Sequence, residues 1–416
     1  MRILYVSQYF TPEMGAPAAR VHELSREWVR LGHQVTVLTA FAHHPTGIKA
    51  QKDRWVLTRR ESIDAIDVVR AYVYAVPNHG TIKRMLSYAS FMLSAAIVGP
   101  FRISSPDVVI ATSPQLLCAA SGFFISRVLK CPFIFEVRDL WPESIIAVDA
   151  MKENPVMYGL RRLSNFLYHA SDRVVTVGPG YKRMITQLYG IDAAKVDVIP
   201  NGIDTALFIP ASRDNAIRQQ HGWGGRFVVM YIGTHGMAHG LDTALQAAKL
   251  LRDVPELLFV FVGEGAEKEN LKRIASAEAL TNVQFIDQQP KSAVPAYYAA
   301  CDLGLVTLRD MPLFQEVLPS KLFEYMGMER PVIVSVGGEA RRLVEDAGGG
   351  EYVAPGSSAA MADAIRRMSA DRELLAAMGR RGRNYVLKHF DRQHLAEEYL
   401  KVLEGVIVGG SWQRIE

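Results

Sequence analysis

The chain has 416 residues, 49% of them hydrophobic, and this length exceeds what one hydrophobic core usually holds, so we expect two domains of about 200 residues each. The net charge is +4, but residues 1–200 carry 23 Lys/Arg against 16 Asp/Glu, whereas residues 201–416 carry 24 against 27. The basic residues are scattered rather than interleaved with aromatic ones, which argues against a nucleic-acid-binding protein. Three widely spaced cysteines argue against a disulfide or zinc framework.

Short apolar runs rich in β-branched residues alternate with helical patterns from the first residue on, and no cleavable apolar segment opens the chain. In the first half the runs are ILYVS, VTVLT, VVRAYVY, VVIAT, FIFEV, VVTV and VDVIP, and in the second half FVVMYIG, LFVFVG, VQFID, LGLVTL and PVIVS. Such runs separated by helices predict parallel sheets covered on both faces. We therefore expect an α/β protein with two doubly wound, Rossmann-like domains that face each other across a deep cleft. The three cysteines suit reduced thiols, so we expect the protein to be cytoplasmic.

The boundary between the domains is predicted from the turn-forming residues 200–204, PNGID, which follow the last strand of the first series. We place the linker at about 200–208, between an N-terminal domain at 1–203 and a C-terminal domain at 208–390. A pattern of apolar residues at helical spacing predicts one more helix at about 393–416. The positive charge of the first half suits a domain that faces an anionic surface, either lipid headgroups or a pyrophosphate-linked acceptor.

Two loops of the first domain carry candidate site residues. Loop 9–20 places Gly15 just before a helix, where a glycine permits close approach of a ligand; the loop either closes over donor phosphates and acceptor or is an ordinary surface loop. It lacks G-x-G-x-x-G, so no dinucleotide cofactor is indicated. Arg138 and Asp139 follow the buried run FIFEV and should emerge in the cleft, where Asp139 either holds a substrate hydroxyl or pairs with Arg138.

The segment 83–102, KRMLSYASFMLSAAIVGPFR, holds 17 uncharged residues, 85–101, between basic ends. It is short for a transmembrane span, and Gly99 with Pro100 should break it early. Two interpretations stay open. The segment is either an interfacial helix, which would make the protein peripheral on the inner face of the cytoplasmic membrane, or a buried crossover helix of the first Rossmann-like unit.

In the second domain, the turn from Gly233 to Gly240 follows a predicted strand and opens a helix, and its glycines permit the tight backbone turns of a phosphate cradle. His235 and His239 are four residues apart, which is the spacing of a zinc pair on a helix. The glycines argue against a regular helix here, and no nearby carboxylate completes a set of ligands, so we predict no metal site.

The stretch 314–335, FQEVLPSKLFEYMGMERPVIVS, predicts a loop, a short helix and a buried strand. Glu316 precedes this helix and Glu324 lies inside it, because a helix start at Ser320 separates them, so both carboxylates should point into one crevice. The helix N-terminus offers unpaired N–H groups to an anionic phosphate, and Lys321 adds a positive charge. Acceptors for sugar hydroxyls beside a phosphate seat point to a nucleotide sugar; the alternative is an amphipathic helix with two solvated acids.

Glu316-x7-Glu324 followed by Pro331-Val332-Ile333 resembles the E-x7-E signature of family-4 retaining glycosyltransferases with the GT-B fold. GAPAARVHEL, VIPNGID and the glycine turn appear in that family's order, so the resemblance covers nearly the whole chain. PSKLFEYM and RDLWPES look most similar to bacterial O-antigen and capsule glycosyltransferases of the N-acetylfucosamine-transferase type. The resemblance implies a first domain that binds the acceptor, joined by the last helix, and a second domain that binds the donor.

The same resemblance implies that Glu316 contacts the donor sugar and that Glu324 binds the ribose hydroxyls. Many family members carry His-Asp where this chain has Arg138 and Asp139, so no histidine role carries over. The candidate catalytic residues are Glu316, Lys321, Asp139 and Arg138, and the candidate donor-binding residues are Gly15, Gly233, Thr234, His235, His239, Gly240, Ser320 and Glu324.

The glycine turn also departs from the family pattern. Many members place an Arg after its first glycine and a Lys before its last, and both bind the diphosphate; this chain has Thr234 and His239 there. We infer that Lys321, with Arg138 or the histidines, supplies the missing positive charge.

The reaction that the resemblance implies is transfer of an N-acetylated hexosyl group from a UDP-sugar to a lipid-linked or saccharide acceptor in surface polysaccharide synthesis. The nucleotide sugar is a substrate, so we expect no cofactor, and the lack of Asp-x-Asp argues against a metal-dependent diphosphate clamp. Three alternatives stay open: a nucleotide-sugar epimerase-type isomerase, a noncatalytic partner in a polysaccharide assembly complex, and a phospholipid-directed mannosyltransferase.

Overall fold

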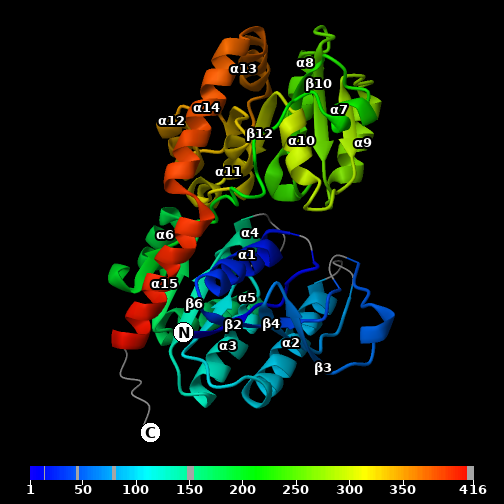
Figure 1. Ribbon diagram of the computed structural model, residues 1–416. Helices are drawn as coiled ribbons and strands as arrows, with labels where there is room; N and C mark the ends of the chain where they lie inside the picture. The colour runs from blue at the N-terminus through cyan, green and yellow to red at the C-terminus, as the bar shows by residue number, and fades with distance from the viewer. Residues whose placement is uncertain (14, 44–45, 77–80, 148–153, 410–416) are drawn as a thin grey trace. The chain divides into compact units, whose positions relative to one another are not determined.

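The computed structural model describes residues 1–13, 15–43, 46–76, 81–147 and 154–409. Its contacts divide the chain into two compact units, an N-terminal domain of Met1–Pro200 with Gln393–Glu416 and a C-terminal domain of Asn201–Arg392 (Figure 1). Each domain is built on one largely parallel sheet with its own helices, which confirms the predicted α/β fold class. The functions assigned above to the two domains stay predictions.

The N-terminal domain contains an eight-stranded sheet with the order β3-β4-β2-β1-β5-β6-β7-β8. The strands are β1 (Arg2–Val6), β2 (Gln34–Ala40), β3 (Thr58–Ile63), β4 (Ile66–Ala71), β5 (Val108–Thr112), β6 (Phe133–Val137), β7 (Arg173–Thr176) and β8 (Val196–Val198). Neighbours pair in parallel except β3 and β4, which are antiparallel. The strand order reverses between β1 and β5, so the loops at the carboxyl ends of these strands form the expected place for a ligand.

Helices of the N-terminal domain include one from the end of the chain. They are α1 (Ala16–Arg30), α2 (Thr81–Arg102), α3 (Leu116–Val128), α4 (Glu143–Ala147), α5 (Pro155–Ala170), α6 (Pro179–Tyr189) and α15 (Arg392–Gly409), with short 3-10 turns at Gln51–Asp53 and Ala193–Lys195. Trp28 of α1 donates a 3.0 Å hydrogen bond from Nε1 to the Ala396 carbonyl, and its ring meets Tyr399 edge-on at 5.3 Å. These contacts fasten α15 to the N-terminal domain.

Helix α2 continues through Pro100 to Arg102, so the early break predicted at Gly99 and Pro100 was wrong. Pro100 lies in the last turn, where the missing N–H removes a single intrahelical bond. Gly99 does not end the helix but allows α2 to pack closely on α3, because a Cβ at Gly99 would lie 2.6 Å from Cδ1 of Ile125. The side of α2 that carries Phe91 and Ala95 is buried, as expected of a crossover helix.

The C-terminal domain contains a parallel six-stranded sheet with the order β11-β10-β9-β12-β13-β14. The strands are β9 (Phe227–Ile232), β10 (Leu257–Val262), β11 (Val283–Ile286), β12 (Leu303–Thr307), β13 (Val332–Ser335) and β14 (Gly350–Tyr352). The helices are α7 (Ala216–Gln220), α8 (Leu241–Leu250), α9 (Lys268–Ala277), α10 (Val294–Ala300), α11 (Ser320–Gly327), α12 (Gly338–Ala347), α13 (Ser358–Ala370) and α14 (Arg372–His389), with 3-10 turns at Met237–His239 and Pro312–Glu316.

Both faces of this sheet are covered, and successive residues of β9 show it. Val228 and Met230 belong to one apolar cluster, whereas Val229 and Tyr231 belong to another on the opposite side. Side chains alternate along a strand, so two separate clusters require helices on both faces. This explains why the strands read as unbroken apolar runs rather than as alternating patterns.

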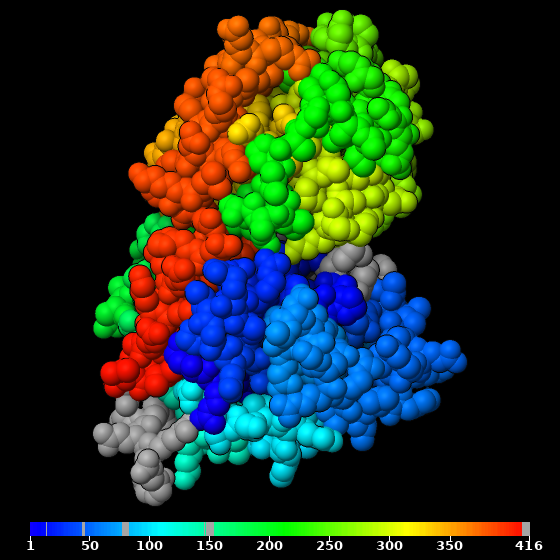
Figure 2. All heavy atoms as spheres, in the orientation of Figure 1, coloured from blue at the N-terminus to red at the C-terminus, as the bar shows by residue number. Residues whose placement is uncertain are grey.

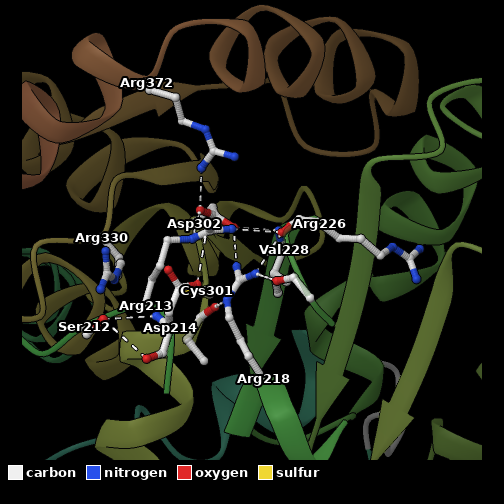
Figure 3. A network of polar contacts seen from close by, with 12 residues as sticks. Ser212, Arg213, Asp214, Arg218, Arg226, Val228, Cys301, Asp302, Arg330 and Arg372 are labelled. Carbon is white, nitrogen blue, oxygen red and sulfur yellow. Dashed lines mark hydrogen bonds and ion pairs between the residues drawn. The ribbon is translucent and has the colours of Figure 1, made fainter. Parts of the chain in front are cut away.

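A buried carboxylate at the start of β12 organises the amino-terminal side of the same sheet (Figure 3). Asp302 accepts hydrogen bonds from Arg218 at 2.5 Å, from Arg213 at 3.0 Å and from Arg372 at 2.6 Å. The backbone N–H of Val228 in β9 also donates to it, at 2.9 Å. One acid therefore joins β9, β12, α7, α14 and the segment that enters the domain.

The three cysteines are buried free thiols that all lie in the described part of the chain. Burial raises the pKa of Cys118 and of Cys301 to about 12, so neither sulfur is a thiolate at neutral pH. They are residues of the two cores.

We expect Asp302→Asn to lower the free energy of unfolding by about 3 kcal/mol, because it leaves three arginines without their shared counter-charge. Urea denaturation followed by circular dichroism measures this loss. Asp253→Ala is the matched control, since its 3.5 Å ion pair with Arg366 is exposed and should contribute less than about 1 kcal/mol. Equal effects of the two substitutions would contradict a structural role for the Asp302 network.

Candidate functional site

The two glutamates of the E-x7-E stretch lie on different elements of the C-terminal domain. Glu316 ends the 3-10 turn Pro312–Glu316, and Glu324 lies inside α11, so one acid precedes the helix and the other belongs to it, as predicted. Helix α11 begins at Ser320 after Pro319, and no side chain caps its N-terminus. The first N–H groups of an uncapped helix remain free to bind an anion such as a phosphate.

Lys321 in the first turn of α11 is a buried amine. Its Nζ lies 3.5 Å from the centroid of the Tyr231 ring, is almost completely buried, and has no hydrogen-bond partner within the described residues. It also reaches the backbone of the glycine turn, because a Cβ at Gly233 would lie 2.9 Å from Nζ. Burial lowers the pKa of Lys321 to about 7, although the nearby Glu324 carboxylate acts in the opposite direction.

The turn that follows β9 packs directly on the turn that follows β10. Gly233 has φ +141° and Gly263 has φ +146°, and a Cβ on Gly263 would lie 1.9 Å from the Gly233 carbonyl oxygen. The His235 N–H donates to the Glu264 carbonyl at 2.8 Å. Only glycines permit this approach, and the approach holds the turn in place beside Lys321.

His235 points into the interior of the domain. It is fully buried, with ring centroids 5.9 Å from Tyr231 and 6.4 Å from Phe261, and neither ring nitrogen has a hydrogen-bond partner in the part of the chain that the structure describes. Burial, reinforced by Lys268 and Lys321, lowers its pKa to about 4. Its imidazole is therefore neutral at pH 7.

His239 ends the same turn at the 3-10 segment Met237–His239, next to Gly240, which has the left-handed φ of +59°. Burial lowers the pKa of His239 to about 3, so it is neutral as well. Thr234 is exposed, and its carbonyl accepts a 2.8 Å bond from the Tyr231 hydroxyl. The two histidines therefore add no positive charge at pH 7, and the cations beside this turn are Lys321 and Arg309, which donates to the Met237 carbonyl at 2.6 Å.

Glu324 is held by a tyrosine from a neighbouring helix. The hydroxyl of Tyr298 in α10 donates a 2.5 Å hydrogen bond to Glu324 Oε2, and burial raises the pKa of that hydroxyl well above its usual range. Tyr325 fastens α11 to the sheet by donating to the Met230 carbonyl at 2.6 Å. Sequence reasoning missed Tyr298, because it lies 26 residues away and no spacing links it to the E-x7-E motif.

The candidate residues of the N-terminal domain gather at the carboxyl end of β6. Arg138 Nη2 donates to the Ala16 carbonyl at 2.8 Å, directly after Gly15, whose φ of +124° suits a glycine. Burial raises the pKa of Asp139 to about 6. The hydroxyl of Ser113 donates to the Asp139 carbonyl at 3.0 Å and accepts from the Arg138 N–H at 3.0 Å, which fixes this loop on the end of β5.

A buried network behind Arg138 also escaped sequence reasoning. Glu136, fully buried in β6, accepts a 2.9 Å bond from Arg20 and another from the Tyr5 hydroxyl. The attraction of Arg20 and Arg138 outweighs the cost of burial and lowers the pKa of Glu136. Arg20 further donates to the carbonyls of Ile199 and Pro200. The only signal was a glutamate inside the apolar run FIFEV.

The C-terminal domain thus brings together a buried amine, a tight glycine turn, an uncapped helix start and an oriented carboxylate. This set can bind a diphosphate and a neighbouring hydroxyl-bearing group. Arg138 and Asp139 belong to the N-terminal domain and lie there in the loop after β6. No three His, Cys, Asp or Glu side chains gather to hold a metal within the described residues.

Comparisons with protein families assign both parts of the chain. A model described as Glycosyltransferase Family 4 matches residues 18–207, and one described as Glycosyl transferases group 1 matches residues 213–385. WcaI of Escherichia coli (strain K12), provisionally named a colanic acid biosynthesis glycosyl transferase, is 25% identical over 416 residues, covering 97% of this chain and all of that protein. WbjE of Pseudomonas aeruginosa, provisionally named a glycosyltransferase, is 26% identical over 283 residues. The match covers 67% of this chain and 69% of WbjE.

Solved structures agree on the fold. Sucrose-phosphate synthase from Thermosynechococcus elongatus has a TM-score of 0.79 at 17% identity and covers 98% of this chain and 100% of its own. Anabaena HepE in complex with UDP and glucose has a TM-score of 0.73 at 20% identity. The match covers 97% of this chain and 99% of the HepE chain. The chain therefore belongs to the GT-B glycosyltransferases in which a Glycosyltransferase Family 4 domain precedes a glycosyl transferases group 1 domain.

Proposed function

We propose that this glycosyltransferase moves an N-acetylated hexosyl group from a UDP-sugar to a saccharide or lipid-linked acceptor in the synthesis of a surface polysaccharide such as an O-antigen, a capsule or an exopolysaccharide. The observation that carries the proposal is the buried Lys321 amine beside the uncapped start of α11 and the Gly233 turn. A diphosphate supplies the negative charge and the acceptors that these groups need. The UDP complex of HepE and the polysaccharide named for WcaI support the donor and the pathway class.

In this proposal the diphosphate binds to Lys321 and to the N–H groups of the Gly233–Gly240 turn and of α11, beginning at Ser320. Glu324, oriented by Tyr298, accepts hydrogen bonds from the ribose hydroxyls. Glu316 orients the donor sugar. Arg138 and Asp139 of the N-terminal domain bind substrate hydroxyls, and Asp139 accepts them best above pH 6, where its carboxyl group is ionised.

The proposed chemistry retains the anomeric configuration. The acceptor hydroxyl oxygen attacks the anomeric carbon on the face from which the diphosphate departs, and the bond from that carbon to the β-phosphate oxygen breaks. The departing β-phosphate takes the proton of the acceptor hydroxyl. Charge on the leaving group is stabilised by Lys321 and the α11 dipole, so we propose that no metal ion is required; the sequence carries no Asp-x-Asp to hold one.

A panel of UDP- and GDP-sugars, tested by isothermal titration with and without EDTA, examines the donor site. We expect one UDP-sugar to bind equally in both conditions and Glu324→Ala to weaken it at least tenfold, because the ribose hydroxyls lose their charged acceptor. Glu345→Ala is the matched control, since this exposed glutamate of α12 pairs only with Arg341 among the contacts described. Binding that needs a divalent ion would contradict the metal-independent mechanism. Conversion of the donor without any acceptor would favour the epimerase-type alternative, and failure of every nucleotide sugar to bind would favour a noncatalytic partner.

The Tyr298 hydroxyl offers a finer test of the ribose contact. We expect Tyr298→Phe to weaken donor binding by about 1 kcal/mol, or roughly fivefold, because Glu324 keeps its charge and loses only its orienting hydrogen bond. The same titration measures it, and Tyr297→Phe on the same helix, whose hydroxyl meets His221 instead, is the control. Equal affinities of the Tyr298 and Tyr297 variants would exclude an orienting role for Tyr298.

A peripheral membrane contact through α2 belongs to the same proposal. Leu86, Leu93, Ile97 and Phe101 form one stripe along the helix, opposite its buried side, and are 53%, 58%, 64% and 85% exposed. Figure 2 shows the segment that contains them, in light blue, at the surface of the N-terminal domain. Exposed basic residues at both ends of the helix, Lys83 and Arg102, would attract anionic headgroups. No helix within the described ranges is long and apolar enough to cross a membrane.

Flotation with vesicles of phosphatidylglycerol and phosphatidylcholine tests this contact. We expect the wild type to float with the vesicles at low salt, and Ile97→Glu with Phe101→Glu to stay at the bottom, because two charges would enter the apolar boundary. Leu188→Glu on α6, where an exposed leucine lies elsewhere on the same domain, should float like the wild type. Flotation of the double variant would assign α2 to packing alone.

A further inference from the structure

The buried amine of Lys321 has no hydrogen-bond acceptor among the described residues, which is unusual for a lysine proposed to bind phosphate. Its Nζ lies over the face of the Tyr231 ring, 3.5 Å from the ring centroid. Among the described residues, no oxygen accepts a hydrogen bond from it. Tyr231 cannot become an anion to balance it, because its hydroxyl donates to the Thr234 carbonyl and burial raises its pKa. An ammonium group in this position would lose its hydration and gain only the face of the Tyr231 ring, without a hydrogen-bond acceptor.

The ionisable groups around this amine do not provide a full counter-charge. Glu324, one turn along α11, attracts an ammonium, but one of its carboxylate oxygens accepts a hydrogen bond from the Tyr298 hydroxyl. His235 and His239, from the turn after β9, are neutral at pH 7, and each is disfavoured as a cation by the charge of Lys321. The pKa of Lys321, about 7, lies nearer to neutrality than that of either histidine.

Resting on the proposed donor site, we infer that binding of the donor's diphosphate is coupled to uptake of one proton by Lys321. Above pH 7 the amine is mostly neutral in the free protein, and the bound diphosphate converts it to the ammonium that stabilises the leaving group. The proton comes from solvent, so no further reactant is needed. Release of the nucleoside diphosphate returns the proton.

The coupling fixes the sign of the pH dependence. Only the protonated fraction of Lys321 is ready to bind an anion, and above pH 7 that fraction falls about tenfold for each pH unit. The affinity for a nucleoside diphosphate should therefore fall by up to tenfold per unit between about pH 7.5 and 9.5. The terminal phosphate of the ligand is already ionised in this range, so its own titration does not produce this slope.

The inference is tested by titrating UDP, and GDP in parallel, into the full-length protein at pH 8 in HEPES, Tricine and Tris buffers. These buffers have different enthalpies of ionisation, so the dependence of the observed heat on the buffer counts the protons taken up. We expect more than half a proton for the wild type. Lys321→Arg should bind with less than a tenth of a proton, because a guanidinium stays charged throughout this range.

Three controls separate the outcomes. Lys249→Arg, at a partly exposed lysine that pairs with Glu278, should keep the wild-type proton uptake. Lys321→Gln should bind at least tenfold more weakly and without uptake, and thermal denaturation establishes that each variant is folded. Uptake that persists in Lys321→Arg would assign the proton to a histidine and overturn the inference. Binding of UDP or GDP with no uptake in the wild type would overturn it as well, while leaving the donor site intact; failure of both nucleotides to bind would overturn the donor site itself.

Discussion

The contact between two glycine turns is the constraint on which the candidate donor site depends. Gly263 approaches the carbonyl of Gly233 so closely that no Cβ fits between them. This approach turns His235 into the interior and leaves the face of Tyr231 open to Lys321. In the proposed donor site, the buried positive charge consequently comes from Lys321 of α11, whereas the turn itself carries Thr234 and His239.

Each domain also holds a buried ionic network near the place where the chain passes from one domain to the other. Arg20, paired with Glu136, donates to the carbonyls of Ile199 and Pro200, where the chain leaves the N-terminal domain for the first time. Arg213, just inside the second domain, binds Asp302. Buried ion pairs add little net stability but are costly to break, so such networks favour one fixed path for the chain over its alternatives.

The fold could be predicted because its strands are buried on both faces and read as apolar runs. The polar edge strand β3, TRRESI, was not predicted, because an antiparallel edge strand does not need to be an apolar run. The placement of Glu316 and Glu324 around a helix start followed from local rules. The interior position of His235 could not, since it results from contacts between turns that lie about thirty residues apart. The roles of all these residues remain predictions.

The inert thiols of the two cores have a practical consequence. Cys118, Cys131 and Cys301 are buried, and the shifted pKa values of Cys118 and Cys301 keep their sulfurs protonated at neutral pH. A maleimide dye should therefore not react with the three native cysteines, but only with a cysteine introduced at the surface. One such cysteine on each domain would carry a pair of fluorophores, and energy transfer between them would follow the separation of the domains through a catalytic cycle.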